Sequence, residues 1–243
     1  MVAGVAAADA AERARRLPRL RIGLHVVLVE GTPALPPEQV SDLVDGAGQF
    51  RTDMAKLGFD IFARPSARRQ LEAEVEAQFQ AFAATGLPLD HVNAHKHFHL
   101  HPTIARTIVA AGRRHGVRGL RVPIEPRAVL VEAEPRTPAG RAWVTTPWAR
   151  LLARSARRAG LQTADAVFGL AWSGAMTQSR VEALLRRLPP GRTEIYLHPA
   201  MRGGFAGQAP GYRYAEELSA LTSPAVIAAA RQPDIALGGY ADF

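Results

Sequence analysis

Short apolar runs alternate with longer helical runs along the whole chain, and this alternation is the feature that most constrains the fold. Strand-like runs that are separated by helical patterns indicate βα units around a mostly parallel sheet. The expected strands are residues 20–28, 89–95, 119–123, 164–169, 193–198 and 235–239. The expected helices are residues 6–16, 66–85, 102–115, 147–159, 179–188, 212–221 and 224–231. The sequence therefore predicts an α/β fold with parallel strands. Its 243 residues fit a single domain, 1–243, with two small domains as the alternative.

Proline and glycine mark several element ends. Pro102 suits the first turn of a helix. Glycines follow three expected helix ends: Gly86, Gly116 and Gly160. Two Pro/Gly-rich stretches, residues 125–140 and 200–211, are predicted to be long loops. Loops of that length are often functional, so we expect both to flank the site.

The composition excludes several classes of protein. No apolar run reaches the ~18 residues that a membrane span needs. The alanine-rich start has no basic region, and Asp9, Glu12 and Arg13 follow it at once in a helical pattern, so we do not interpret it as a signal peptide. The chain has no cysteine, which excludes disulfides and thiolate metal sites and favours the cytoplasm as the compartment.

The formal net charge of +8 raises the question of nucleic-acid binding. The basic residues are dispersed, almost all are arginine, and no aromatic residues are interleaved among them as in single-strand binders. We therefore expect a solvated, arginine-rich surface and no nucleic-acid partner. Attraction to an anionic membrane surface stays open as an alternative, and so does a homodimer.

Five of the eight histidines lie between residues 91 and 101, all at odd positions, and Asn93 shares that phase. In an extended segment these side chains share one face, with alternate residues about 6.6 Å apart. Imidazoles aligned on one face are poor core material unless they are paired, whereas they are good ligands for zinc and similar ions. We predict a metal site in which two or three side chains bind the ion and the others orient ligands or substrate. A structural role without a metal is the alternative.

Two further histidines end expected strands. His25 follows Ile22-Gly23-Leu24, and His198 precedes Pro199. Each alone would be a satisfied core or strand-end histidine, but together they favour a shared site, because α/β folds build their sites at the carboxyl ends of strands. His115, at an expected helix end, is interpreted as a surface residue that interacts with the helix dipole.

Three motifs, in order, resemble the YdjC-like family, which includes carbohydrate deacetylases, and the resemblance extends over the whole chain. The stretch from Gly23-Leu24-His25 to Gly31-Thr32-Pro33 matches the first motif. His91 to His99 match the histidine signature, with Asn93 and Ala94 in place of the usual Asp and Ser. Glu194 to Pro199 match a third motif, Glu-x-x-x-His-Pro.

The resemblance implies an incomplete or distorted (β/α) barrel and a divalent metal ion, magnesium or zinc, held by one Asp and two His. It implies removal of the acetyl group from an N-acetylated amino sugar. The two ligand histidines correspond to His25 and His95, and His198 is the expected acid toward the leaving amine. Four residues are expected to bind substrate or to orient the ligands: His97, His99, Arg121 and Glu194.

Within the family, residues His95 to His99 and Leu120 to Pro126 most resemble the branch associated with hopanoid biosynthesis. That resemblance implies an N-acetylglucosaminyl group carried by a hopanoid lipid as the substrate. A glycolipid needs an apolar surface beside the polar site. The side chains expected to form it are Trp143, Trp148, Phe205 and Tyr212.

The family's metal-binding Asp belongs to an Asp-Asp-Phe-Gly motif at the end of the first strand, and this sequence contains no Asp-Asp pair. We therefore expect that the first βα unit is missing, that the natural protein starts upstream of Met1, and that the 243-residue chain is inactive or unstable. Two rival functions stay open. One is a non-catalytic metal- or glycan-binding module. The other is a different metallo-hydrolase, whose site is completed by Glu30, Asp90, Glu125 or Glu194.

Overall fold

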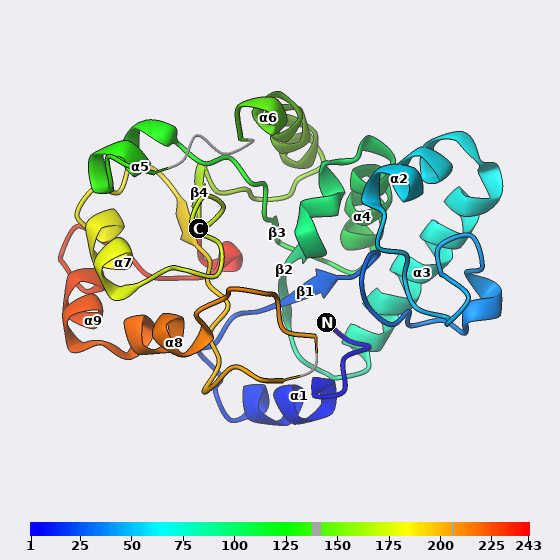
Figure 1. Ribbon diagram of the computed structural model, residues 1–243, viewed down its shortest axis with the longest axis horizontal. Helices are drawn as coiled ribbons and strands as arrows, with labels where there is room; N and C mark the ends of the chain where they lie inside the picture. The colour runs from blue at the N-terminus through cyan, green and yellow to red at the C-terminus, as the bar shows by residue number, and fades with distance from the viewer. Residues whose placement is uncertain (138–141, 206) are drawn as a thin grey trace. The chain divides into compact units, whose positions relative to one another are not determined.

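The computed structural model describes residues 1–137, 142–205 and 207–243, without the side chains of residues 142–144. The described chain divides into two compact units (Figure 1). Unit 1 comprises Met1–Arg121, Leu151–Thr163 and Gly238–Phe243. Unit 2 comprises Val122–Arg150 and Ala164–Leu237.

The elements follow the predicted alternation of strands and helices. The described strands are β1 (Ile22–Val26), β2 (Leu89–Ala94), β3 (Gly119–Leu120), β4 (Ala166–Phe168) and β5 (Thr193–Ile195). The described α-helices are α1 (Ala7–Arg15), α2 (Met54–Ala63), α3 (Pro65–Ala83), α4 (Pro102–Arg114), α5 (Arg127–Ala133), α6 (Ala142–Arg158), α7 (Gln178–Leu185), α8 (Tyr214–Thr222) and α9 (Pro224–Ala230). The described 3-10 helices are η1 (Pro37–Gln39), η2 (His95–Leu100) and η3 (Tyr240–Asp242).

Unit 1 contains a parallel sheet with the strand order β1-β2-β3, which confirms the predicted parallel α/β fold. In the β1–β2 register, His25 lies opposite Asn93 and Gly23 lies opposite His91. A Cβ atom at Gly23 would lie 2.3 Å from His91 Nε2, so only glycine leaves room for the histidine ring. The register therefore explains the glycine of the Gly-Leu-His motif.

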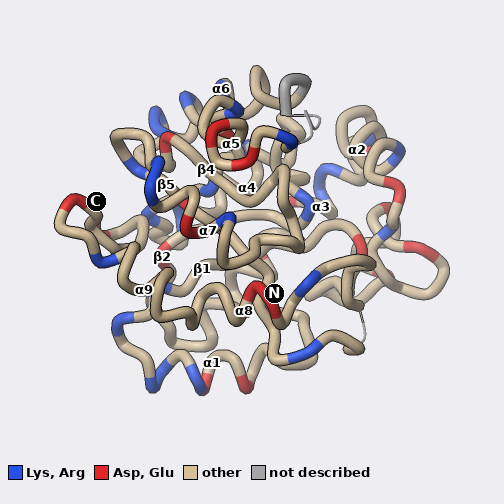
Figure 2. Tube along the Cα trace, turned by 60° about the vertical axis from the view of Figure 1, so that its left-hand side comes forward, with Lys and Arg blue, Asp and Glu red and all other residues tan. Residues whose placement is uncertain are grey.

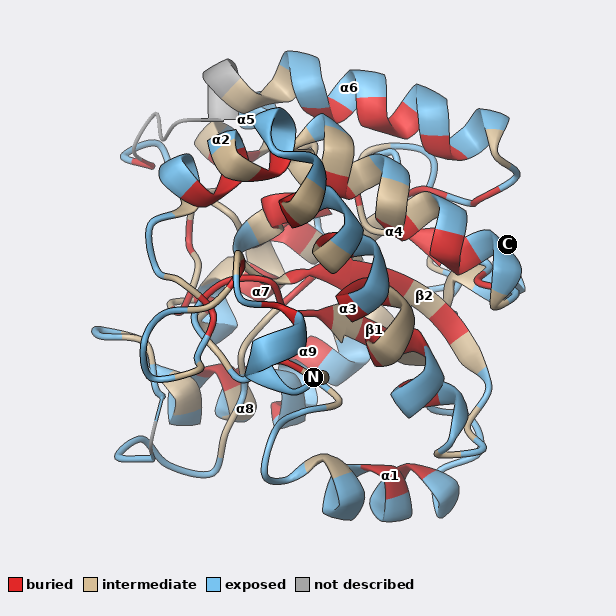
Figure 3. Ribbon diagram, turned by 90° about the vertical axis from the view of Figure 1, so that its right-hand side faces the viewer, coloured by how far each residue is buried: buried red, intermediate tan, exposed pale blue. Residues whose placement is uncertain are grey.

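The core of unit 1 lies between this sheet and its helices. As predicted, Pro102 stands in the first turn of α4, and Gly86 and Gly116 follow α3 and α4, both with positive φ. Pro65, which was not predicted, stands in the first turn of α3. Figure 3 shows buried residues on β1 and β2 and on the inner faces of α3 and α4. Side chains at most 1% exposed fill this core: Leu24, Val26, Leu71, Val75, Phe79, Val92, Ile104 and Ile108.

The segment after β1 is held by polar side chains of α3. Gln78 Nε2 donates to the Val27 carbonyl at 2.6 Å, and the Val27 N–H donates to Gln78 Oε1 at 3.0 Å. The carboxylate of Glu74 accepts the N–H groups of Ala34 and Leu35. One side-chain amide thus satisfies both backbone groups of a residue that leaves the sheet.

Unit 2 contains a two-stranded parallel sheet, in which Val167 lies opposite Glu194. Helices α5, α7, α8 and α9 pack around one apolar cluster. Its buried members are Leu130, Ala166, Phe168, Trp172, Met176, Val181, Leu184, Ala220 and Val226.

Several predicted elements differ from the structure. Residues 235–239 form no strand, because they pair with no described strand. The prediction missed α2, which begins at the N-cap Asp53, and α5, which lies inside the stretch 125–140 that we predicted to be a loop. Leu130 of α5 is buried in the apolar cluster of unit 2, and this packing stabilises the helix. Residues 138–140 of this stretch, and residue 206 of the stretch 200–211, lie outside the described residues. No helix of the described chain is both long and apolar enough to cross a membrane.

The amide of Gln78 predicts a specific loss of stability. Gln78→Leu leaves the buried N–H and carbonyl of Val27 without a partner, and each such group costs about 1–3 kcal/mol. We expect urea unfolding to show a loss of about 2–5 kcal/mol in the free energy of unfolding. The exposed Gln80→Leu, on the same helix, should stay within about 0.5 kcal/mol of the wild type. Equal losses in the two variants would contradict the role given to Gln78.

Candidate functional site

His25 and Asn93 lie side by side at the carboxyl ends of β1 and β2. His25 Nδ1 is 2.5 Å from Asn93 Oδ1. Because the carboxamide oxygen can only accept, Nδ1 carries the hydrogen and Nε2 keeps its lone pair. Asn93, at the position where the family resemblance implies Asp, thus fixes the tautomer of His25.

The chain turns sharply after β2. Lys96 and His97 have φ values of 50° and 53°, in the left-handed region, and residues His95–Leu100 form η2. The prediction of one extended histidine face is therefore wrong beyond residue 94. Non-glycine residues in this conformation cost about 1–2 kcal/mol each, so the surrounding structure has to hold the turn.

The turn brings the ring of His95 to that of His25. His25 Nε2 lies 3.3 Å from His95 Nδ1, and the ring centroids are 5.5 Å apart at an angle of 78°. Two nitrogen atoms bound to one tetrahedral zinc at about 2.0–2.1 Å are themselves about 3.3 Å apart. Either one ring donates a proton to the other, or both bind one cation. The pair therefore fits two ligands of a metal ion.

A third protein ligand is not part of this arrangement. Among the described residues, no group of three or more His, Cys, Asp and Glu side chains could hold a metal ion. The metal roles of His25 and His95 stay predictions.

Electrostatics keep His25 neutral. Burial lowers the pKa of His25 to about 3, and the positive charges of His95 and Arg121 act in the same direction. The hydrogen bond to Asn93 opposes the shift only in part. A neutral imidazole is the form that binds a metal ion.

His99 is fully buried and holds the backbone of Arg121. Its Nε2 donates to the Arg121 carbonyl at 2.8 Å, while the Arg121 N–H donates to the Val92 carbonyl at 3.0 Å. Burial lowers the pKa of His99 to about 4. The structure thus brings His99 and Arg121 together with His25 and His95. The ring of His97 lies 6.1 Å from that of His99.

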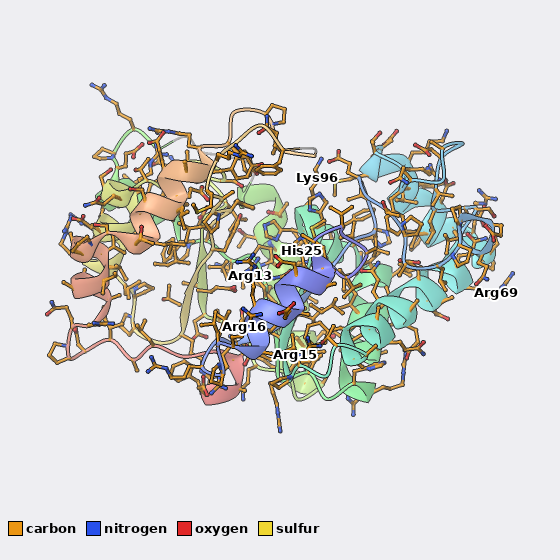
Figure 4. The ribbon with its side chains drawn as sticks, turned by 90° about the horizontal axis from the view of Figure 1, so that it is seen from below. Arg13, Arg15, Arg16, His25, Arg69 and Lys96 are labelled. Carbon is orange, nitrogen blue, oxygen red and sulfur yellow. The ribbon has the colours of Figure 1, made fainter. Side chains whose placement is uncertain are left out.

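Lys96 and Glu30 form an ion pair between the segments that follow β2 and β1. Figure 4 labels Lys96 close to His25. Glu30 also has a left-handed φ of 51°. The pair therefore joins two of the strained residues beside the histidines.

Other candidates have structural roles. Asp90 accepts the N–H groups of Tyr240 and Ala241 and lies 2.9 Å from His91 Nδ1. Burial opposes its ionisation, but these hydrogen bonds prevail and lower the pKa of Asp90. The buried Glu125 accepts three consecutive N–H groups, those of Gly169, Leu170 and Ala171, and burial raises its pKa. His91, Asp90 and Glu125 hold segments of the chain.

His198 and Glu194 belong to unit 2. Glu194 lies in β5, and His198 lies three residues after its end. The His198 N–H donates to the buried Glu217, whose Oε2 is 4.0 Å from His198 Nδ1. Glu217 also accepts the N–H of Met176 at 3.0 Å. Sequence reasoning missed Glu217, since an acid in the first turn of a helix usually lies at the surface.

Aromatic rings surround His198. The rings of Tyr196 and Tyr212 lie 5.6 and 5.0 Å from it, both edge-on. Tyr212 and Phe205 belong to the predicted apolar set, and Phe205 is 43% exposed. Trp148 is 58% exposed on α6, and the side chain of Trp143 lies outside the described residues.

Comparison with known proteins shows the family to which this chain belongs. The profile of the YdjC-like protein family matches residues 1–232. A carbohydrate deacetylase of Geobacillus stearothermophilus is 28% identical over 242 residues, which cover 98% of this chain and 82% of that protein. The carbohydrate deacetylase of Mus musculus is 31% identical over 274 residues, covering 100% and 84% of the two chains. A crystal structure from Enterococcus faecalis V583, of a candidate cellobiose-phosphate cleavage protein, has a TM-score of 0.74 and 25% identity, and covers 100% of this chain and 85% of that one.

The buried His99 predicts a pH-dependent stability. Its pKa is about 4 in the folded chain and near 6.5 in the unfolded chain, so the unfolded chain binds more protons between these values. Stability should be complete above pH 6.5 and should fall by about 3 kcal/mol as the pH falls toward 4. His99→Gln keeps a donor for the Arg121 carbonyl and should flatten this fall in urea unfolding. Identical slopes for variant and wild type would contradict the assignment.

Proposed function

Because the chain belongs to the YdjC-like protein family, we propose that it is a carbohydrate N-deacetylase built around a divalent metal ion. The observation that carries the proposal is the distance of 3.3 Å between His25 Nε2 and His95 Nδ1. Both rings lie at the carboxyl ends of adjacent parallel strands, where α/β folds place their sites. The substrate class comes from relatives named carbohydrate deacetylases.

Each residue of this arrangement has a task in amide hydrolysis. His25 and His95 hold the ion, magnesium or zinc, and Asn93 keeps Nε2 of His25 free of hydrogen. A bound ion of this kind polarises an acetamide carbonyl and lowers the pKa of a water molecule. The positive charge of Arg121 suits the negative charge that develops on the acetamide oxygen. His99 positions Arg121 by a hydrogen bond to the Arg121 carbonyl.

His198 is the proposed acid toward the leaving amine. Glu217 lies beside Nδ1 of His198, which leaves Nε2 to carry a proton to the amide nitrogen. A buried carboxylate 4.0 Å from a histidine nitrogen stabilises the charged form of the ring by Coulomb attraction. Glu194, the second residue of β5, lies opposite Val167 and is proposed to assist substrate binding.

The proposed substrate is an N-acetylglucosaminyl group on a hopanoid lipid. The support for it is the run of residues His95 to His99 and the segment Leu120 to Pro126. In this segment Arg121 lies beside the histidines, and Glu125 holds the loop after β4. Activity of the 243-residue chain is proposed to be low, because no described carboxylate joins the histidine pair.

The second candidate is a non-catalytic metal- or glycan-binding module. The same observation favours it, because a histidine pair without a carboxylate lacks the base that amide hydrolysis needs. The two functions differ in whether acetate is released.

Metal binding tests the histidine pair. Zinc titration by calorimetry should show that His25→Ala and His95→Ala abolish the site. Asn93→Ala should weaken it by about 10–100-fold, because the tautomer of His25 is no longer fixed. His97→Ala and His99→Ala should retain more metal than either ligand variant. Unchanged zinc affinity in His25→Ala would refute the proposed ligands.

Acetate release tests the reaction. We expect the chain to release acetate from an N-acetylglucosaminide at least about 10²-fold more slowly than the deacetylase of Geobacillus stearothermophilus under the same conditions. A hopanoid-linked sugar should be deacetylated faster than a soluble chitobiose-type sugar. Zinc binding with no acetate from either compound would favour the binding module. Equal rates on both compounds would count against the lipid substrate.

A further inference from the structure

Helix α2 is apolar on two opposite faces. Leu57, Gly58 and Ile61 are buried against unit 1. On the other side, Phe59 and Phe62 are 68% and 64% exposed. These two phenylalanines are three positions apart, so their rings are neighbours on one helix face. A surface helix normally turns a polar face to water, and two adjacent exposed aromatic rings indicate that this face has a partner.

Basic side chains surround this aromatic face. Lys56 lies on α2, and Arg68 and Arg69 lie in the first turns of α3. Figure 2 shows the basic segments at α2 and at the start of α3, and in Figure 4 Arg69 projects outward from its helix.

Two of the nearby acids have basic partners of their own. Asp60 pairs with Arg51 at 2.7 Å, and Asp42 pairs with Arg64 at 2.8 Å. With these two pairs neutral, the three cations Lys56, Arg68 and Arg69 exceed the two exposed acids Asp53 and Glu72 by one positive charge.

Helix α2 packs directly on the segment that carries the histidines. His101 hydrogen-bonds to the backbone of Gly58. A Cβ atom at Gly58 would lie 3.4 Å from the His101 ring and 3.7 Å from the Phe98 ring. Phe98 belongs to η2, the turn that begins with His95. A molecule bound to the outer face of α2 thus lies one helix away from the site.

We propose that the face formed by Phe59 and Phe62 docks on an anionic membrane surface. Aromatic rings with a basic rim are the composition of helices that lie in the bilayer interface. The exposed part of the two rings is about 300 Å², whereas a stable protein–protein interface needs about 800 Å² on each partner. The area favours a lipid surface, into which two rings insert while the cations meet anionic headgroups. This inference goes beyond the proposed function and does not depend on it.

Vesicle co-sedimentation of the full chain tests the proposal. The wild type should bind phosphatidylcholine vesicles that contain phosphatidylglycerol more strongly than vesicles of phosphatidylcholine alone. F59S/F62S should lower the partition coefficient at least about tenfold, since two buried rings are lost. K56Q/R69Q should lower it about fivefold per charge on the anionic vesicles only, and added salt should reduce that difference.

Two controls keep the result interpretable. Leu237→Ser removes an apolar side chain that is 69% exposed in unit 2, and it should bind as the wild type does. F59W/F62W keeps aromatic rings at the interface and should retain binding. No vesicle binding by the wild type, or equal binding by F59S/F62S, would overturn the proposal. Concentration-dependent dimerisation that F59S/F62S abolishes would assign the face to a second copy of the chain instead. Vesicle binding is measured without acetate release. A failure of the membrane proposal can therefore be distinguished from a failure of the deacetylase proposal.

Discussion

Parallel strands are joined by long connections rather than by tight turns, so side chains have to set their register. In unit 1 the contact of the His91 ring with Gly23 is such a determinant, because any larger residue at position 23 would collide with the ring. The same register sets His25 opposite Asn93. A slip by one residue would turn His25 to the other face of the sheet and remove its hydrogen bond. The tautomer of His25 and its approach to His95 therefore depend on a glycine two residues earlier in the chain.

Buried carboxylates accept backbone N–H groups that the short strands leave without partners. Strands of two to six residues satisfy few backbone groups, and the segments that follow them need other acceptors. Glu74, Asp90, Glu125 and Glu217 each accept two or three backbone N–H groups from distant segments. An acid that is fully engaged in this way has little capacity left for a metal ion or a water molecule. Asp90 and Glu125, which the alternative metallo-hydrolase would use, thus have a structural role in the hydrogen bonding of distant segments.

The sequence was sufficient for the parallel α/β arrangement, which follows from the alternation of strand-like and helical runs. The proximity of His25 and His95 was expected from the family resemblance, and their ring nitrogens lie 3.3 Å apart. The sequence was insufficient for features of the backbone and of burial that depend on tertiary contacts. The turn at Lys96 and His97 has left-handed backbone that alternation of residues does not reveal. Helix α2 was not predicted, although Asp53 caps it and Leu57, Gly58 and Ile61 are buried on one side. Glu217 escaped because its burial depends on N–H groups from Met176 and His198, which are far away in the sequence.

The charges around the histidine pair bear on how strongly two imidazoles could hold a divalent cation. His25 is neutral, because burial lowers its pKa to about 3, and it therefore offers a lone pair but no negative charge. Arg121 places a positive charge near it. The charge of Lys96 is balanced by Glu30, whose carboxylate is engaged in that ion pair. A divalent cation would thus enter a region that is neutral to positive, where Coulomb repulsion opposes it. Strong binding requires an anionic ligand that joins the two histidines, and this requirement gives a physical reason for the aspartate that the resemblance to the family implies.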